Sequence, residues 1–356
     1  MRVFGERADR GVHLVGSIPA ASAYDAMRAV AAVLGDRLDR LPDGETAERA
    51  DWIAWQYPIL ARTEGLSAVA GADGAYRGLA PLRLADDRQA SLRGALGYAD
   101  AAIASYEVFT ALRAAGSVPA WCRFQVSLPT PLSPVAAFVE EGSRARVEPA
   151  YEAAMLGELG TILGAIPHAD LAIQWDANFE FAMLDGSLTP WFPDAPAGVI
   201  ERLLRLGELV PVDVKLGFHF CQDHRRLQHP RPYDATRMVD TAIAVVSAMR
   251  RRLDWLHVPV PEARLDVTFF EKLAPLSARP DTTLYLGLVH LHEGDAGAGA
   301  RITAARRYLK HFGVASACGW GRHGPTELPE LLRLHHDATG PVAAAPPAAR
   351  STMSAS

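Results

Sequence analysis

A histidine and a cysteine two residues apart, His219 and Cys221, are the side chains in this sequence whose types and spacing most directly indicate chemistry. They close a mostly apolar run, Val214 to Cys221, of the kind that forms a short buried strand. Because side chains alternate between the two faces of a strand, both would project on the same side. The pair is therefore either half of a metal site or a histidine and a small hydrophobe packed in a core.

The bulk properties of the chain exclude several classes of protein. A length of 356 residues is usual for one α/β barrel with inserted loops, and a hydrophobic content of 49% supports a large core. The net charge of −5 is too small to indicate nucleic acid or an anionic membrane as the main partner. An odd number of cysteines, 3, argues against a disulfide framework.

The two ends of the chain bear on location and domain boundaries. Residues 1–11 are polar and lack the apolar centre of a signal peptide, and no apolar run is long enough to span a bilayer. We therefore expect a soluble, cytoplasmic protein. Residues 340–356 are rich in Ala, Pro and Ser and are expected to form a disordered tail, which leaves one domain over residues 1–339.

Apolar periodicity predicts about eight strands that alternate with helices. Strands are expected over residues 12–17, 123–128, 171–176, 214–221, 255–261, 284–289 and 314–317. Helices are expected over residues 22–34, 95–115, 147–166, 200–209, 300–312 and 327–336, with a further helix after Asp234. Residues 40–45 are interpreted as a turn-rich acidic loop, and residues 65–94 yield no element. The alternation predicts a single (β/α)8 TIM-type barrel with inserted loops.

In such a barrel the carboxyl ends of all strands meet at one mouth, where active sites lie. The side chains expected there are Ser17, Glu45, Asp176, Cys221, Glu262, His292 and Cys318. Cys122 begins its strand and so belongs at the opposite end, in a structural role. Together with His219, this group offers an imidazole, two thiolates and a carboxylate, which suit tetrahedral zinc better than magnesium or calcium. Those four side chains are His219, Cys221, Glu262 and Cys318.

Short motifs spread over residues 12–338 carry a family resemblance. They are Val15-Gly16-Ser17, Asp43-Gly44-Glu45, Gln174-Trp175-Asp176, His219-Phe220-Cys221, Val260-Pro261-Glu262, His290-Leu291-His292 and Ala317-Cys318-Gly319. In these motifs the chain resembles the C-terminal catalytic barrel of cobalamin-independent methionine synthase. The wider superfamily includes uroporphyrinogen decarboxylase and zinc-dependent thiol alkyltransferases. The resemblance implies a zinc ion held by His219, Cys221, Glu262 and Cys318.

The same resemblance implies positions that bind the substrate. Ser17 matches a loop serine that contacts homocysteine, while Glu45 and Asp176 match carboxylates that hold its ammonium group. Carboxylates only accept hydrogen bonds, so two of them facing a cationic amine make physical sense. The alternative for these positions is ordinary loop capping, and Glu48 competes with Glu45 for the match.

The resemblance also implies a proton donor, His292. A histidine can protonate a departing anion near neutral pH. His290, two residues earlier, is the competing choice. Either histidine could instead orient a ligand through a hydrogen bond to it.

The chain departs from the family pattern on the side of the methyl donor. The family places a tryptophan after the third strand and an Arg-Cys pair in an earlier loop; residues 128–132 contain no tryptophan, and the pair is absent. Glu180 and Asp185 only imperfectly match a further carboxylate. These departures argue against a folyl-polyglutamate donor.

The sequence predicts a zinc-dependent S-methyltransferase that transfers a methyl group to homocysteine or a related amino thiol. Its expected partners are a small thiol and a methyl or alkyl donor. The alternatives are a thiol alkyltransferase or lyase that uses a non-folate electrophile such as an epoxide, and a zinc-binding barrel without catalysis.

Overall fold

The computed structural model describes residues 8–76, 78–92, 96–221, 235–262, 267–277 and 281–339. Within these residues, seven parallel strands form one curled sheet in the order β1-β4-β5-β6-β7-β8-β9, and a two-stranded antiparallel sheet stands apart. The strands of the large sheet are β1 (Arg40–Pro42), β4 (Arg123–Pro129), β5 (Leu171–Ala177), β6 (Lys215–Phe220), β7 (Trp255–Pro259), β8 (Thr283–Gly287) and β9 (Gly313–Ala315). The small sheet pairs β2 (Leu66–Ala68) with β3 (Leu82–Leu84).

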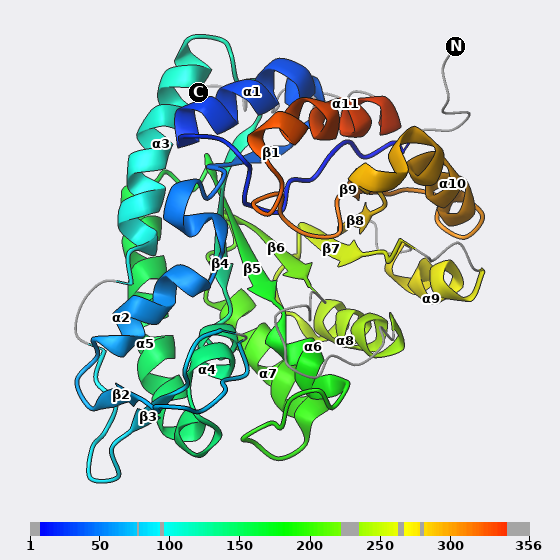
Figure 1. Cartoon of the computed structure of the whole chain (residues 1–356). Helices are drawn as coiled ribbons and strands as arrows, with labels where there is room; N and C mark the ends of the chain where they lie inside the picture. Colours follow the sequence, from blue (N-terminus) through cyan, green and yellow to red (C-terminus); the bar gives the residue numbers. More distant parts are fainter. Residues whose placement is uncertain are drawn as a thin grey trace, which may run out of the picture.

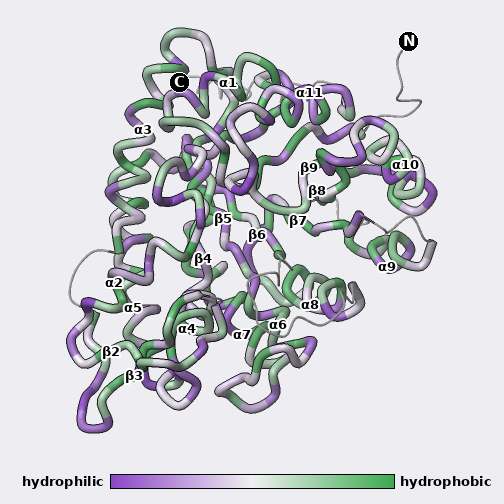
Figure 2. Tube along the Cα trace, in the orientation of Figure 1, coloured by the Kyte–Doolittle hydropathy of each residue, from purple (hydrophilic) through white to green (hydrophobic). Residues whose placement is uncertain are grey.

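Helices lie outside the curled sheet and connect its strands (Figure 1). They are α1 (Ala23–Leu34), α2 (Tyr57–Ala61), α3 (Tyr98–Ala114), α4 (Leu132–Phe138), α5 (Glu141–Ala165), α6 (Phe179–Leu184), α7 (Ala195–Glu208), α8 (Ala235–Ala248), α9 (Val267–Ser277), α10 (Gly294–Arg306) and α11 (Leu328–Ala338). Hydrophobic and hydrophilic stretches alternate along these helices (Figure 2), as expected when one side faces a core. In β5 every residue is buried, as is typical of a parallel strand covered on both faces.

The expected first strand, residues 12–17, is reduced to isolated bridges. Val12 is bridged to Leu38, just before β1, and to Val314 in β9, so one residue connects the two edges of the sheet. The amide of Val12 donates to the Arg37 carbonyl at 2.9 Å. Further along, the Ile18 amide donates to Gly44 O at 2.6 Å, in the loop after β1. The α/β class with a parallel sheet is confirmed, whereas the described residues do not form an eight-stranded ladder.

Other differences concern short elements. β1 lies in the segment interpreted as a loop, and β2 and β3 lie where no element was expected. α4 begins directly after Pro131 and contains Pro134 in its first turn. Both prolines fit the start of this helix, because the first amides of a helix have no intrahelical acceptor to lose. The predicted tail, residues 340–356, lies outside the described residues, among which no helix is long and apolar enough to cross a membrane.

Large side chains fill the interior of the curled sheet below the site. The Arg40 guanidinium lies 3.9 Å from the ring centre of Trp255 and 4.9 Å from that of Tyr285. Both rings are fully buried. Gly217 makes room for this layer, since a Cβ at that position would lie 1.9 Å from a ring atom of Trp255. The packed interior supports β6 two residues before His219.

Candidate active site

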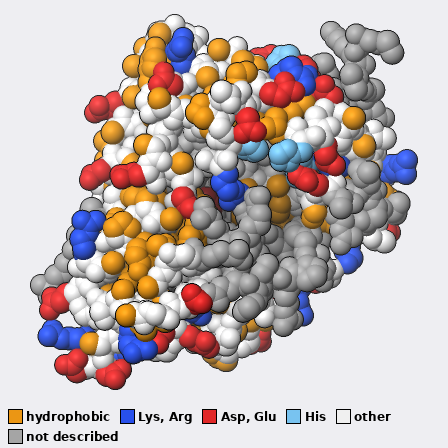
Figure 3. All heavy atoms as spheres, viewed as in Figure 1, with side chains coloured by type: hydrophobic (Ala, Val, Ile, Leu, Met, Phe, Trp, Pro, Cys, Tyr) orange, Lys and Arg blue, Asp and Glu red, His pale blue; other side chains and the backbone are white. Residues whose placement is uncertain are grey.

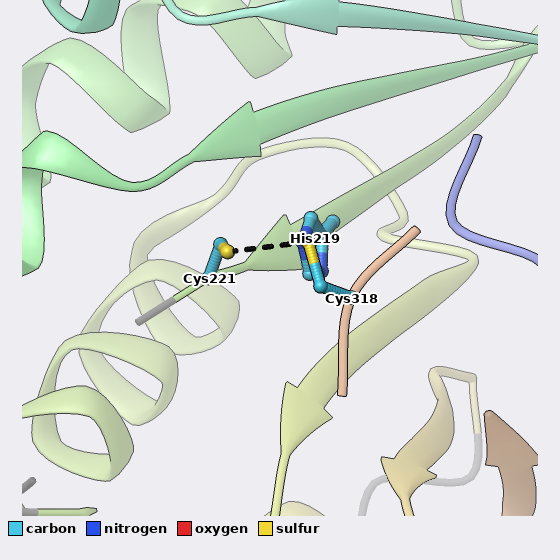
Figure 4. A group of neighbouring side chains, drawn as sticks. All are labelled: His219, Cys221 and Cys318. Carbon is cyan, nitrogen blue, oxygen red and sulfur yellow. Dashed lines mark hydrogen bonds between the residues drawn. The ribbon is translucent and has the colours of Figure 1, made fainter. Parts of the chain in front are cut away.

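Three potential metal ligands meet at the carboxyl end of the sheet: His219, Cys221 and Cys318 (Figure 4). His219 belongs to β6, Cys221 follows its last residue, and Cys318 lies in the loop after β9. Their ligand atoms all lie within 4.8 Å of one another. The separation is 3.6 Å between the two sulfurs and 3.8 Å between Cys318 Sγ and His219 Nε2.

This arrangement fits a zinc ion. Zn–S bonds of about 2.3 Å and Zn–N bonds of about 2.0 Å in a tetrahedron separate neighbouring ligand atoms by roughly 3.5–3.8 Å. Two sulfurs and an imidazole are also the donor set that favours zinc over hard cations. The hydrogen bond with Cys221, together with His219, holds the pKa of the Cys318 thiol well below its ordinary value despite burial. Cys318 is thus favoured as a thiolate, the form that binds a metal.

Glu262, the fourth ligand implied by the resemblance, does not join this group. Its side chain is 55% exposed, and Oε1 lies 3.6 Å from His290 Nδ1. It does line the same pocket of about 320 Å³ as Cys318. Three protein ligands beside a pocket match the open coordination of catalytic rather than structural zinc sites. Coordination by Glu262 stays a prediction.

Ser17 and Glu45 lie next to the loop that carries Cys318. The Ser17 hydroxyl accepts a hydrogen bond from the Gly321 amide at 3.2 Å. A Cβ at Gly16 would lie 2.9 Å from the Glu45 carboxyl group, so this carboxyl group lies directly over the glycine. Glu45 has a φ of 42°, a left-handed conformation that residues with side chains seldom adopt outside functional sites.

The carboxyl groups of Glu45 and Asp176 lie close to the candidate metal ligands. Asp176 is next to His219 in the register of β5 and β6, and it accepts a hydrogen bond from Gln174 Nε2 at 2.8 Å. Burial, followed by the charge of Asp43, raises the pKa of Glu45 to about 8. Burial and the charge of Glu45 raise the pKa of Asp176 well above its ordinary value. A cation between these two carboxyl groups would offset their repulsion, so the pair could hold one.

The three acidic residues of this loop, Asp43, Glu45 and Glu48, differ in their surroundings. Glu48 is exposed. Asp43 is already engaged: Oδ2 pairs with Arg49 and accepts from Ser105 Oγ at 2.9 Å, and Oδ1 accepts from the Glu45 amide at 2.9 Å. Asp43 therefore shapes the loop, and Glu45 is the carboxylate directed at the site.

Both candidate proton donors line the pocket beside Cys318. His290 is partly buried, with Nε2 2.9 Å from Val260 O, and burial lowers its pKa. His292 is exposed, on the short 3₁₀ turn Leu291–Glu293. Exposed histidines and acidic side chains gather on this face of the molecule over α10 and α11 (Figure 3).

Glu180 is fully buried in α6, and its carboxyl group is already bound within the protein. It accepts from Thr130 Oγ1 at 2.5 Å and from Ser133 Oγ at 3.4 Å. Burial raises its pKa to about 7. Asp185 is the residue that follows α6, and its Oδ1 accepts from the Ser187 amide at 2.8 Å. Both carboxyl groups hold local structure. Cys122, 1% exposed, lies just before the first residue of β4, at the opposite end of the sheet, as expected.

Two buried histidines near His219 were not predicted from the sequence. His257 in β7 is the register neighbour of His219, and their Nδ1 atoms lie 2.6 Å apart. His13 lies with its ring centre 5.5 Å from that of His257. The signal for His257 was present, since it follows Trp255 by two residues and shares the inward face of that strand. Burial, reinforced by His219, lowers the pKa of His257 well below its ordinary value.

The fold and the site together define an α/β protein with a candidate thiolate and imidazole metal centre at the carboxyl end of a curled parallel sheet. No protein-family model and no curated protein matches the sequence. Several solved structures match the fold, and two of them match over nearly their whole length. One is a putative vitamin-B12-independent methionine synthase from Listeria monocytogenes, with 14% identity and a TM-score of 0.55 over 94% of this chain and 97% of that chain.

The other is a B12-independent methionine synthase from Shewanella sp. W3-18-1 in complex with selenomethionine. Its identity is 11%, with a TM-score of 0.59 over 93% of this chain and 96% of that chain. The resemblance to cobalamin-independent methionine synthases is therefore confirmed at the level of the fold.

Proposed function

We propose that the protein is a zinc-dependent S-methyltransferase that methylates homocysteine or a related amino thiol. The observation that carries the proposal is the placement of two carboxyl groups, that of partly buried Glu45 and that of buried Asp176, beside the His/Cys/Cys group. A metal group alone could be structural, but carboxyl groups poised for a cation add a place for the substrate ammonium group. The Shewanella structure, of similar fold, is in complex with selenomethionine, an amino acid in which selenium takes the place of a thioether sulfur.

His219, Cys221 and Cys318 would hold the ion, and Glu262, which lines the same pocket, would be the fourth ligand. A free thiol with a pKa of about 8.5 is mostly protonated near neutral pH. A zinc ion at this site would bind the sulfur of the substrate and keep it deprotonated.

The protein's own residues orient the reaction. Glu45 and Asp176 bind the ammonium group, and Ser17 contacts the amino acid beside them. The sulfur attacks the methyl carbon of the donor, a C–S bond forms, and the bond between that carbon and the leaving group breaks. His292, in the pocket beside Cys318, protonates the leaving group.

The residues at the positions expected to contact the methyl donor support a donor other than folate. Glu180, the best match to the further carboxylate of the family, is sealed by Thr130 and Ser133 and is not open to a donor. An alkyl electrophile such as an epoxide is therefore the second candidate. It would transfer a larger carbon group to the same sulfur.

Metal content and product formation test the proposal. Purified wild-type protein is expected to contain one zinc per chain, and Cys221→Ser and Cys318→Ser are expected to lose it. Cys122→Ser, which changes the cysteine at the opposite end, is expected to retain it. Mass spectrometry of homocysteine incubated with folate-based donors, other methyl donors and epoxides would then identify the transferred group.

Two outcomes would overturn parts of the proposal. Unchanged zinc content in both serine variants would remove the site assignment. Zinc bound at the site without alkylation of any thiol, and without a change in the spectrum of a cobalt-substituted sample on adding thiols, would establish a non-catalytic zinc-binding protein.

A further inference from the structure

We propose that His257 is a positioning residue for His219: through two hydrogen bonds it keeps the proton of His219 on Nδ1 and leaves Nε2 free to bind the metal. The inference rests on the proposed function only in taking His219 as a ligand.

The hydrogen bonds begin at a backbone carbonyl. His257 Nε2 lies 3.0 Å from the Ser316 carbonyl oxygen, which can only accept. His257 Nε2 must therefore carry a proton. Ser316 is itself held in place, because Trp320 Nε1 donates to its hydroxyl at 2.8 Å.

The next hydrogen bond joins the two imidazoles. The Nδ1 atoms of His219 and His257 lie 2.6 Å apart, so one proton lies between them. His257 is 0% exposed, and a charged ring there would lose its hydration without an anionic partner. His257 is therefore neutral with its proton on Nε2. Its Nδ1 accepts, and His219 Nδ1 donates.

This direction decides what His219 offers to the metal. With its proton on Nδ1, His219 presents a lone pair on Nε2, the atom 3.8 Å from Cys318 Sγ. The opposite direction would put the proton of a neutral His219 on Nε2 and block metal binding. Metal-binding histidines usually donate to a carboxylate, a carbonyl or water; here the acceptor is a second imidazole.

The hydrogen bonds also connect the two segments that carry the ligands. Ser316 precedes Cys318 by two residues, in the loop after β9, while His219 belongs to β6. Together, His257 and Ser316 fix the ring of one ligand relative to the backbone that carries another.

Nitrogen-15 NMR of histidine side chains in reduced, metal-free wild-type protein tests the inference directly. The expected result is His219 protonated on Nδ1 and His257 protonated on Nε2. A spectrum with His219 protonated on Nε2 would overturn the proposal. No variant and no bound metal is needed for this measurement, so it holds even if the protein proves to lack zinc or catalysis.

Two substitutions separate positioning from packing. His257→Phe fills the space without an acceptor, whereas Asn in His257→Asn can place its Oδ1 where Nδ1 was. We expect His257→Phe to weaken zinc affinity about 10–100-fold and to give His219 a mixed protonation pattern, and His257→Asn to restore most of both. Affinity is measured by competition with a chromophoric chelator.

His335→Leu is the matched control. His335 is also 0% exposed, and it contacts the Ser316 hydroxyl at 3.3 Å without touching His219. It is expected to lower stability but to leave zinc affinity and the protonation of His219 unchanged. Equal loss of affinity in His257→Phe and His335→Leu, or wild-type affinity in folded His257→Phe, would contradict a positioning role.

Discussion

Glu45 combines a left-handed backbone, a position against Gly16 and a pKa raised to about 8, mainly by burial. The unfolded chain loses this proton near pH 4.5, so between about pH 4.5 and 8 the folded protein holds a proton that the unfolded chain does not. Stability is therefore expected to fall as pH rises through this window. A bound ammonium group would offset this loss, because it favours the ionised carboxylate.

Glu45→Gln is expected to reduce the fall in thermal stability of the metal-free protein between about pH 5 and 8.5, because glutamine cannot ionise. In the zinc-loaded enzyme the same change should raise KM for the amino thiol about tenfold or more, the value of a charge-assisted hydrogen bond. Thermal melts and initial rates measure the two effects. Exposed Glu48→Gln should change neither, and a similar rise in KM in that variant would refute the assignment to Glu45.

His292 and His290 are distinguished by what holds their nitrogens. His290 Nε2 is hydrogen-bonded to the Val260 carbonyl, whereas His292 is exposed at the pocket. We expect His292→Gln to lower kcat about 100-fold or more, since general acids contribute about 10²–10⁴-fold. His290→Gln should affect kcat less. If His290→Gln has the larger effect on kcat, the two roles are exchanged.

At the scale of the element, β6 depends on Gly217, a glycine within the apolar run Val214 to Cys221. A Cβ on Gly217 would lie 1.9 Å from the Trp255 ring, which is locked over Arg40. We expect Gly217→Ala to destabilise the protein by about 1–3 kcal/mol or more through overpacking, and to weaken zinc binding by moving His219. Chemical denaturation with a parallel zinc titration measures both.

Gly160→Ala in α5 is the matched control, because nothing lies within 4 Å of its added Cβ. It should stabilise the helix by about 0.5–1 kcal/mol. A Gly217→Ala variant as stable as the wild type would mean that Trp255 can move without cost.

The long elements were predictable from sequence because their apolar period is strong. The strands expected over residues 171–176 and 123–128 end within one residue of β5 and β4, and the helix expected over residues 22–34 matches α1. The three-residue β1 was missed, since so short a strand has no period of its own and its pairing with β4 defines it. Val12 makes only isolated bridges where a strand was expected, because the length of a strand pairing also depends on the loops beside it.

For the whole molecule, the sequence indicated which residue types gather at one end of the sheet but not how their side chains meet. His219, Cys221 and Cys318 converge as the resemblance implied, although 97 residues separate the two cysteines. Glu262 turns toward His290 instead, and the contact of His219 with His257 depends on strand register. Such contacts depend on a few ångströms of packing, which periodicity does not encode.

A bound ion would connect β6 to the loop after β9, and so tie together segments distant in sequence. Zinc should therefore stabilise the native chain by about 2.7 kcal/mol when free zinc exceeds Kd 100-fold. We expect chelation to lower Tm and added zinc to restore it in the wild type and in Cys122→Ser, whose thiol is buried at the far end of the sheet. Cys318→Ser should melt at one temperature whether or not zinc is present. Calorimetry with and without chelator measures this difference, and a zinc-dependent Tm that persists in Cys318→Ser would place the stabilising ion elsewhere in the molecule.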